Sequence, residues 1–150
     1  MDFTVRALSA DDAAAIVALL RAQPPDYLRF FYALPADESA VRNVMEQRQR
    51  DLYQGLFEGD RLVGFFMLRG WDAGYDIPSF GIVVDQRTSG KGYLHATLEL
   101  AAGLCRDAGA KRFMAKIHPE NLAPRAARRL QLTQVGVEAS TGNVIYHREV

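Results

Sequence analysis

The sequence predicts an α/β protein in which helices flank one mixed sheet. Apolar runs of strand length alternate along the chain with segments in which apolar residues recur at helical spacing. Turn signals rich in Gly, Pro, Asn and Asp separate the two kinds of segment. The chain has 150 residues and contains no repeat, low-complexity tract or linker, so we expect residues 1–150 to form a single domain.

The first part of the chain is expected to contain a strand, two helices and a hairpin. Ser9 is a candidate N-cap followed by acidic residues, and Pro24 ends the helix that begins there. Gly59 and Asp60 lie between two apolar runs, which is typical of a hairpin turn. We expect strands at residues 3–8, 53–57 and 62–68 and a second helix at about residues 36–50.

The second part of the chain is expected to alternate strands and helices. One run, at residues 77–84, is apolar almost throughout, which suits a strand at the centre of a sheet. Gly109 is a natural C-terminal cap for the helix that precedes it. We expect strands at residues 77–84 and 113–117 and on both sides of a turn at 141–143, and helices at about 92–108 and 123–132.

Composition and charge exclude several classes of function. Lys plus Arg number 18 and Asp plus Glu number 18, and this balance argues against nucleic acid or an anionic membrane as the main partner. The single cysteine, Cys105, excludes an internal disulfide, and its place on an apolar helix face indicates a core residue. The three histidines are widely separated, so we expect no metal site. Without a signal sequence or an apolar run of roughly 20 residues, we expect a cytoplasmic protein.

The segment most informative about chemistry is a strand followed by a glycine loop and a helix, at residues 82–94. Gly90 and Gly92 permit a tight turn and a close approach of the backbone to a ligand. The first N–H groups of a helix that begins there have no intrahelical partner, and the helix dipole adds partial positive charge. We therefore predict that residues 89–94 bind a diphosphate, with Lys91 at the rim. The pattern leaves open a plain strand-to-helix turn that uses glycine only for its geometry.

Two nucleotide-binding motifs do not fit this loop. A Walker A loop requires GxxxxGK(S/T), but Lys91 lies between the two glycines and Tyr93 follows the second one. A dinucleotide-binding fingerprint belongs to the first strand-to-helix turn and has an acidic residue at the end of the next strand. Here the loop follows the fourth predicted strand, and that acid is missing.

The loop and the order of the elements resemble those of GNAT acetyltransferases. Arg87-Thr88-Ser89-Gly90-Lys91-Gly92 matches the acetyl-CoA loop pattern of that family, (Q/R)xxGx(G/A). A second alignment, to the family run V-x-P-x-x-R-G-x-G-x-G, places Val84 on the first valine, Ser89 on the arginine and Leu94 on the last glycine. We prefer the second alignment because it preserves the helical phase of Leu94 and Leu98. In addition, Asn121 follows the strand at 113–117 as an asparagine does in the family.

The resemblance implies a mixed, mostly antiparallel sheet of about six or seven strands with about four helices, in which strands 4 and 5 splay apart. It implies acetyl-CoA as the acyl donor and no metal. Backbone N–H groups of the fourth strand would bind the pantetheine arm, and the N–H of Ile82 would hold the developing oxyanion. The acetyl group would pass directly to an amine, without a covalent enzyme intermediate. The cofactor-binding residues expected from the resemblance are Ile82, Val83, Val84, Ser89, Gly90, Lys91, Gly92, Tyr93, Leu94, Asn121 and Arg128.

Proton transfer is the step for which the sequence departs from the family. Many members carry a proton-donating tyrosine seven residues after the asparagine, but Arg128 occupies that position here. Asp76, Ser79 and His118 are the candidates for a base or relay. Each is also explained without catalysis, as a loop solvator, a strand-edge hydroxyl and a strand-end residue, respectively. Arg128 and its arginine neighbours contact either the 3′-phosphate of CoA or an anionic acceptor, or else form a solvated helix face.

The acceptor is expected to be a small molecule with a primary amine. Its expected contacts are aromatic side chains, namely Tyr27, Phe30, Phe31 and Trp71, although such residues are more often part of a core. The run at residues 69–79 resembles GNAT members associated with surface-sugar biosynthesis, so an amino-sugar nucleotide is one candidate. The sequence leaves open a longer acyl donor, a homodimer, and a catalytically silent module that binds CoA or a protein partner.

Overall fold

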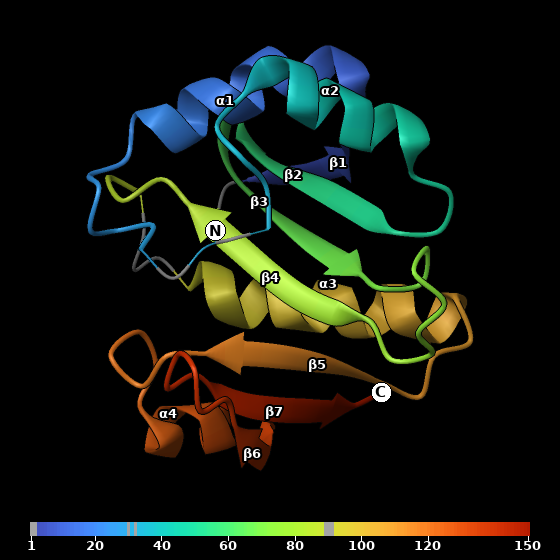
Figure 1. The fold of residues 1–150 in the computed structure, drawn as a ribbon, viewed down its shortest axis with the longest axis vertical. Coiled ribbons are helices and arrows are strands. Elements are labelled where there is room, and N and C mark those ends of the chain that lie inside the picture. Colours follow the sequence, from blue (N-terminus) through green and yellow to red (C-terminus); the bar gives the residue numbers. More distant parts are fainter. Residues whose placement is uncertain (1–2, 30, 32, 89–91) are drawn as a thin grey trace. The chain divides into compact units, whose positions relative to one another are not determined.

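A computed structural model of the chain describes residues 3–29, 31, 33–88 and 92–150 (Figure 1). The strands are β1 (Thr4–Ala7), β2 (Leu52–Glu58), β3 (Arg61–Arg69), β4 (Ser79–Val84), β5 (Arg112–Ile117), β6 (Thr133–Val137) and β7 (Val144–Glu149). They form one seven-stranded sheet in the order β1-β2-β3-β4-β5-β7-β6. β4 and β5 run parallel, whereas β1 with β2, β5 with β7 and β6 with β7 run antiparallel. The predicted mixed, mostly antiparallel sheet is therefore confirmed.

The residues of the chain cluster into two compact units. The first unit comprises Met1–Met67 and Ile82–Tyr93, and the second comprises Leu68–Gly81 and Leu94–Val150. The division falls within β3 and β4, so the chain crosses from one unit to the other inside these strands. Each unit is described below by itself.

The two helices of the first unit begin differently. Ser9 precedes a single 3-10 turn, η1 (Ala10–Asp12), and its N–H donates to the Asp12 carboxylate at 2.8 Å before α1 (Ala13–Arg21) starts. The second helix, α2 (Glu38–Gln47), is shorter than the predicted 36–50. It starts late because the Asp37 carboxylate accepts the Ala40 N–H at 2.9 Å, which makes Asp37 the N-cap.

The core of the first unit lies between its helices and its strands. In Figure 1, α1 and α2 lie next to each other over β1, β2 and β3. The apolar face of α1 and the inward side chains of the strands are fully buried, which is the pattern expected for a helix packed on a sheet. Members of this core include Ile16, Leu20, Val41, Tyr53, Phe65 and Val83. The predicted hairpin is confirmed, since Gly59 turns the chain between β2 and β3 with a φ of +62°.

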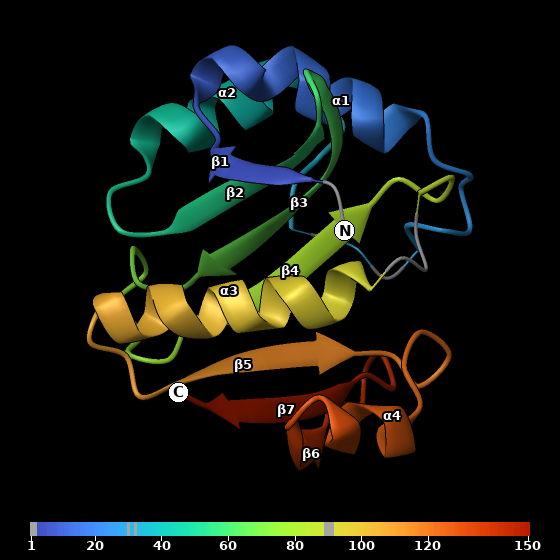
Figure 2. The ribbon, with the colours of Figure 1, turned by 180° about the vertical axis from the view of Figure 1, so that it is seen from behind.

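The second unit contains α3 (Tyr93–Asp107), apart from its first residue, and α4 (Pro124–Arg129) (Figure 2). Gly109 ends α3 with a φ of +80°, as predicted from the sequence. The prediction of a helix at 123–132 was too long: α4 ends at Arg129, and Gln131 then adopts a left-handed φ of 62° that a helix does not continue through. Glu99 of α3 accepts a hydrogen bond from the Arg148 guanidinium of β7.

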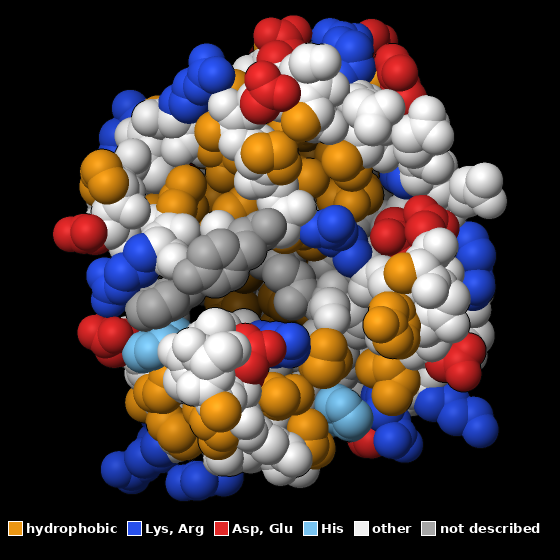
Figure 3. Space-filling model, in the orientation of Figure 1, with side chains coloured by type: hydrophobic (Ala, Val, Ile, Leu, Met, Phe, Trp, Pro, Cys, Tyr) orange, Lys and Arg blue, Asp and Glu red, His pale blue; other side chains and the backbone are white. Residues whose placement is uncertain are grey.

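The surface carries charges of both signs. Lys and Arg side chains are interspersed with Asp and Glu side chains on the face shown in Figure 3. Within the described residues, no helix combines the length and the apolar character needed to cross a bilayer.

Candidate functional site

The edges of β4 are distinguished by two backbone hydrogen bonds. The Asp85 N–H donates to the Val63 carbonyl of β3 at 2.7 Å, and the Pro78 carbonyl accepts from the Met114 N–H of β5 at 2.8 Å. Successive residues of an extended strand direct their N–H and C=O groups to opposite edges. The backbone N–H and C=O groups of the odd-numbered residues of β4 therefore point toward β3, and those of the even-numbered residues point toward the opposite edge of the strand.

This alternation separates the three residues that were predicted to bind pantetheine. Val83 directs its backbone to β3, in agreement with its carbonyl oxygen lying beside Gly64. Ile82 and Val84 direct their N–H groups to the opposite edge. The register pairs of β4 with β5 involve Ser79 and Phe80, at the start of β4. Ile82 and Val84, unlike Val83, thus present N–H groups away from β3.

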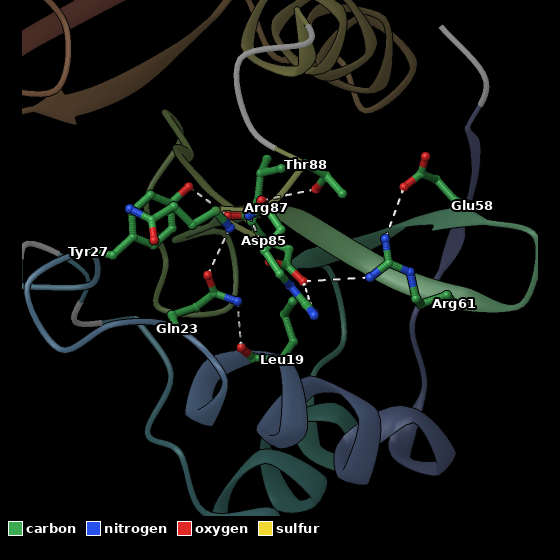
Figure 4. Close-up of polar contacts among 10 residues, drawn as sticks. Leu19, Gln23, Tyr27, Glu58, Arg61, Asp85, Arg87 and Thr88 are labelled. Carbon is green, nitrogen blue, oxygen red and sulfur yellow. Dashed lines mark hydrogen bonds and ion pairs between the residues drawn. The ribbon is translucent and has the colours of Figure 1, made fainter.

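The end of β4 is held by the segment that follows α1 (Figure 4). The Tyr27 hydroxyl donates to the Val84 carbonyl at 2.6 Å. The Gln23 side chain, which is buried, accepts the Gln86 N–H at 2.9 Å and donates to the Leu19 carbonyl at 3.0 Å. Tyr27, predicted as part of an acceptor wall, therefore has its hydroxyl committed to the backbone of β4.

The turn after β4 is organised by Asp85, which is 3% exposed. Its carboxylate accepts the Arg87 N–H at 3.0 Å and the Arg87 guanidinium at 2.8 Å, and the hydrogen bonds from Arg87 are the main reason that the Asp85 pKa falls to about 2. The Thr88 N–H and hydroxyl both donate to the Asp85 carbonyl, at 2.8 and 3.0 Å. The N–H groups of Gln86, Arg87 and Thr88 are thus engaged within the protein, and none of the three can contribute to a diphosphate site.

The predicted diphosphate loop is only partly described. Ser89, Gly90 and Lys91 lie outside the described residues. Gly92 follows with a φ of +77°, and α3 begins at Tyr93, one residue later than predicted. N–H groups in the first turn of a 15-residue helix lack intrahelical partners, as an anion site requires.

The remaining positions at the start of α3 are packed. Tyr93 is buried, its ring lies 5.1 Å from that of Phe3, and burial raises the pKa of its hydroxyl. Leu94 is half-buried and Leu98 fully buried, so both belong to the apolar face of α3. The side chains of Tyr93 and Leu94 therefore contribute to packing, and their N–H groups are the parts suited to a ligand.

The candidate catalytic residues lie at different positions along the strand direction. Ser79 is level with Met114 in the β4–β5 register, whereas His118 comes four residues after Met114, about 13 Å further along the strand direction. Ile82 lies three residues beyond Ser79, about 10 Å along β4. Asp76 is exposed in the bend before β4. Ser79 and His118 are consequently too far apart to act on the same proton.

His118 is half-buried just after β5, and its ring is oriented by a backbone group. Its Nδ1 accepts the Glu120 N–H at 3.2 Å, and the Glu120 carboxylate lies 3.4 Å from the same nitrogen. In the tautomer in which Nδ1 accepts the Glu120 N–H, the neutral ring carries its proton on Nε2 and can donate it from there, whereas the nearby Glu120 carboxylate favours a proton on Nδ1.

Asn121 and Arg128 flank the start and the face of α4. Asn121 is exposed, and its N–H donates to the His118 carbonyl at 2.8 Å, whereas the N-cap of α4 is Ala123. Arg128 is exposed and lines a pocket of about 450 Å³, whose other lining residues are Pro124, Gln131, Leu132, Thr133, Gln134 and Tyr146.

Tyr146, which sequence reasoning did not single out, is buried at this pocket. Burial raises the pKa of its hydroxyl, and that hydroxyl has no hydrogen-bond partner among the described residues. The only signal in the sequence was its apolar alternation within β7, which is typical of a core position.

The other predicted acceptor contacts are aromatic residues of unequal exposure. Phe31 is half-buried, with its ring edge-on to Phe65 at 6.1 Å. Trp71 is 5% exposed and leaves little surface for a ligand. Phe30 lies outside the described residues.

Metal-ligating and nucleophilic groups are sparse in the described parts of the chain. No group of three or more His, Cys, Asp or Glu side chains in residues 3–29, 31, 33–88 and 92–150 could hold a metal ion. Cys105 is buried, and burial raises the pKa of its thiol to about 11, which leaves it protonated and unreactive at neutral pH.

Comparison with known proteins identifies the family. The chain is similar in fold to the PaiA N-acetyltransferase from Thermoplasma acidophilum in complex with coenzyme A, at 14% identity and a TM-score of 0.80 over all of both chains. It is also similar to the GNAT domain of S. lividans PAT (19% identity, TM-score 0.79, covering 97% of this chain and 89% of that one). A third similar structure is RimL, a ribosomal L7/L12 alpha-N-protein acetyltransferase (17% identity, TM-score 0.79, covering 100% of this chain and 91% of that one). No curated protein matches the sequence. A family model described as an acetyltransferase (GNAT) domain matches residues 2–132, and the chain therefore belongs to the GNAT family of N-acetyltransferases.

Proposed function

We propose that residues 1–150 form one catalytic domain that transfers an acetyl group from acetyl-CoA to the primary amine of a small molecule. The observation that carries the proposal is the alternation along β4, which leaves the N–H groups of Ile82 and Val84 directed away from β3. Such N–H groups are suited to the amide carbonyls of a pantetheine arm and to the oxygen of a thioester.

In the proposed reaction, the amine nitrogen attacks the thioester carbon directly. The carbon–nitrogen bond forms as the carbon–sulfur bond breaks, and the Ile82 N–H stabilises the negative charge that develops on the carbonyl oxygen. Val83, whose backbone pairs with β3, supports this geometry without contacting the donor. The diphosphate is assigned to residues 89–94, with Asn121 and Arg128 as further contacts to the donor.

Two protons must move in this reaction, one from the amine and one to the leaving thiolate. We assign the second to His118, because its Nδ1 accepts the Glu120 N–H and the neutral ring then carries a proton on Nε2. This assignment supplies an acid in a chain that has Arg128 at the position of the usual tyrosine. Asp76 and Ser79 stay as candidates for handling the amine proton.

The acceptor that we propose is an amino sugar attached to a nucleotide. The proposal is supported by the resemblance of residues 69–79 to GNAT members associated with surface-sugar biosynthesis. Aromatic faces at Tyr27, Phe30, Phe31 and Trp71 would stack on the sugar or the base, although the burial of Trp71 limits its contribution.

The proposal is tested by binding first and by turnover second. Isothermal titration with CoA and acetyl-CoA should show binding, and no binding at millimolar ligand would remove the proposal. Release of thiol from acetyl-CoA is then measured with amino-sugar nucleotides, simple primary amines and peptides with a free N-terminus. Acetylation of the peptides alone would contradict a small-molecule acceptor, and binding without turnover on any amine would favour a non-catalytic module.

A matched pair of proline variants tests the role of the β4 backbone. Ile82→Pro deletes an N–H that points away from β3, and Val83→Pro deletes one that points toward β3. We expect the first variant to keep its circular dichroism spectrum and to lose about 100-fold in turnover or more. The second is expected to lose about 3 kcal/mol of stability. Turnover of a folded Ile82→Pro variant within threefold of the wild type would contradict the oxyanion assignment.

A further inference from the structure

We infer that Tyr27 is a positioning residue that fixes the last peptide unit of β4 and thereby the N–H groups that receive the acyl donor. The inference rests on the proposed function of β4, and it assigns to the Tyr27 hydroxyl a role on the donor side of the reaction, separate from the stacking face that its ring offers to an acceptor. Its basis is one direct contact, the 2.6 Å hydrogen bond from the Tyr27 hydroxyl to the Val84 carbonyl, between residues 57 positions apart in the sequence (Figure 4).

Both polar groups of the peptide unit that joins Val84 to Asp85 are engaged on opposite sides. Its carbonyl accepts from the Tyr27 hydroxyl, and its N–H donates to the Val63 carbonyl of β3 at 2.7 Å. A peptide plane held from both edges has little freedom to rotate about its neighbouring φ and ψ angles. The Val84 N–H belongs to the preceding peptide unit and lies on the same edge as that carbonyl, so a fixed Val84–Asp85 plane restrains it through the angles at Val84.

The next peptide unit is held by the same part of the chain. The N–H of Gln86 donates to the Gln23 side chain at 2.9 Å, and Gln23 is itself bound to the Leu19 carbonyl of α1 at 3.0 Å. Consecutive peptide units at the end of β4 are therefore tied to the end of α1 and to the turn that follows it. A single contact could be incidental, but two contacts on adjacent peptides form a clamp.

The described residues next to Tyr27 make backbone hydrogen bonds of their own. The Tyr27 N–H donates to the Pro24 carbonyl at 3.0 Å, and the Phe31 N–H donates to the Leu28 carbonyl at 2.9 Å. Tyr27 and Leu28 are both half-buried, and Leu28 packs against the core of the first unit. Because Tyr27 and Gln23 hold the end of β4 in the ligand-free protein, less conformational entropy is lost when the donor binds that backbone.

Removal of the hydroxyl by Tyr27→Phe tests the inference, because the aromatic ring is retained. We expect the Kd for CoA and the KM for acetyl-CoA to rise roughly two- to tenfold, the range expected for one lost hydrogen bond. The KM for the amine acceptor should stay close to the wild-type value, and the melting temperature should fall by only a few degrees, the cost of one hydrogen bond. Tyr75→Phe is the matched control, since it also removes one tyrosine hydroxyl, from a side chain that is 68% exposed. In the ligand-free protein, the carbonyl ¹³C resonance of Val84 should move upfield in Tyr27→Phe and stay unchanged in Tyr75→Phe.

The outcomes separate this inference from the proposed function. Unchanged CoA affinity in Tyr27→Phe, or a rise in the acceptor KM instead of the acetyl-CoA KM, would overturn the positioning role while leaving the acetyltransferase proposal intact. A wild-type protein that fails to bind CoA would overturn both. Should Tyr27→Phe fail to fold, Gln23→Met removes the neighbouring contact of the clamp and is expected to weaken CoA in the same direction. Wild-type affinity in that variant would then overturn the inference.

Discussion

We expect substitution of the charged residue Asp85 to destabilise the first unit. Its carboxylate is almost fully buried and accepts hydrogen bonds from the N–H and the guanidinium of Arg87, with the guanidinium of Arg61 3.8 Å away. Asp85→Asn keeps the shape of the side chain and one acceptor oxygen but removes the charge. The substitution also directs an NH₂ group toward a guanidinium, which cannot accept a hydrogen bond.

The size of the effect follows from the pKa of Asp85. Hydrogen bonds from Arg87 lower that pKa from its ordinary 3.8 to about 2, which corresponds to about 2 kcal/mol of stabilisation at neutral pH. The Arg87 side chain is 73% exposed, so solvent and salt screen part of this energy. We therefore expect Asp85→Asn to lower the free energy of unfolding by about 1 to 2 kcal/mol at pH 7.

The stabilisation that Asp85 contributes should decrease as the pH falls. A carboxyl whose pKa is depressed in the folded state binds a proton more readily in the unfolded state, so acid favours unfolding. The contribution of Asp85 is complete above pH 4 or so and disappears as the pH falls to about 2, with about half remaining near pH 3. The difference between Asp85→Asn and the wild type should narrow over that same interval.

Urea unfolding at pH 7, 5, 4 and 3, followed by circular dichroism and tryptophan fluorescence, measures this difference. Asp60→Asn, at the exposed hairpin turn, is the matched control and should be neutral at every pH. A difference between Asp85→Asn and the wild type that stays constant from pH 7 to pH 3 would refute the reasoning. Asp85→Asn should also destabilise an Arg87→Gln variant less than it destabilises the wild type. An equal loss of unfolding free energy in both proteins, that is, additivity of the two substitutions, would likewise refute the reasoning.

Three further predictions concern packing and buried polar groups. Gly64→Ala should cost about 1 to 3 kcal/mol in urea unfolding, because the added methyl would lie 2.6 Å from a backbone carbonyl oxygen of β4, whereas Gly103→Ala in α3 should be neutral or stabilising. Cys105 should react with a thiol reagent such as DTNB only after unfolding, since burial raises its pKa to about 11; rapid labelling of native protein would contradict this. Arg148→Met should melt near the wild-type temperature. Glu99→Ala leaves the buried Arg148 guanidinium unpaired and should cost about 1 to 3 kcal/mol, since the Glu99 side chain is half exposed; the reverse order would show that the ion pair itself stabilises the fold.

Much of the fold was predictable because its signals are local. The β2–β3 hairpin, the end of α3 at Gly109 and the apolar β4 each depend on residues within one or two turns of chain. Helix ends were predicted less well. α2 and α4 are shorter than expected because the Asp37 cap decides where α2 starts and the left-handed Gln131 prevents α4 from continuing.

The candidate site was predictable only in outline. The order of strand, glycine loop and helix predicted a diphosphate site, and the alternation of β4 shows that Ile82 and Val84, but not Val83, direct their N–H groups away from β3. The sequence did not predict the buried hydroxyl of Tyr146, since the alternation of apolar residues around Tyr146 in β7 is the same as for any core residue.

By itself, the sequence determined the class of fold, the order of the elements and the GNAT family, because periodicity and loop motifs are properties of neighbouring residues. The tertiary structure decided which N–H groups of β4 are already engaged, why Asp85 binds the turn that follows it, and that Tyr27 and Gln23 hold the end of β4. Those contacts join residues as many as 63 positions apart, and their geometry depends on how helices pack on a sheet rather than on any local pattern.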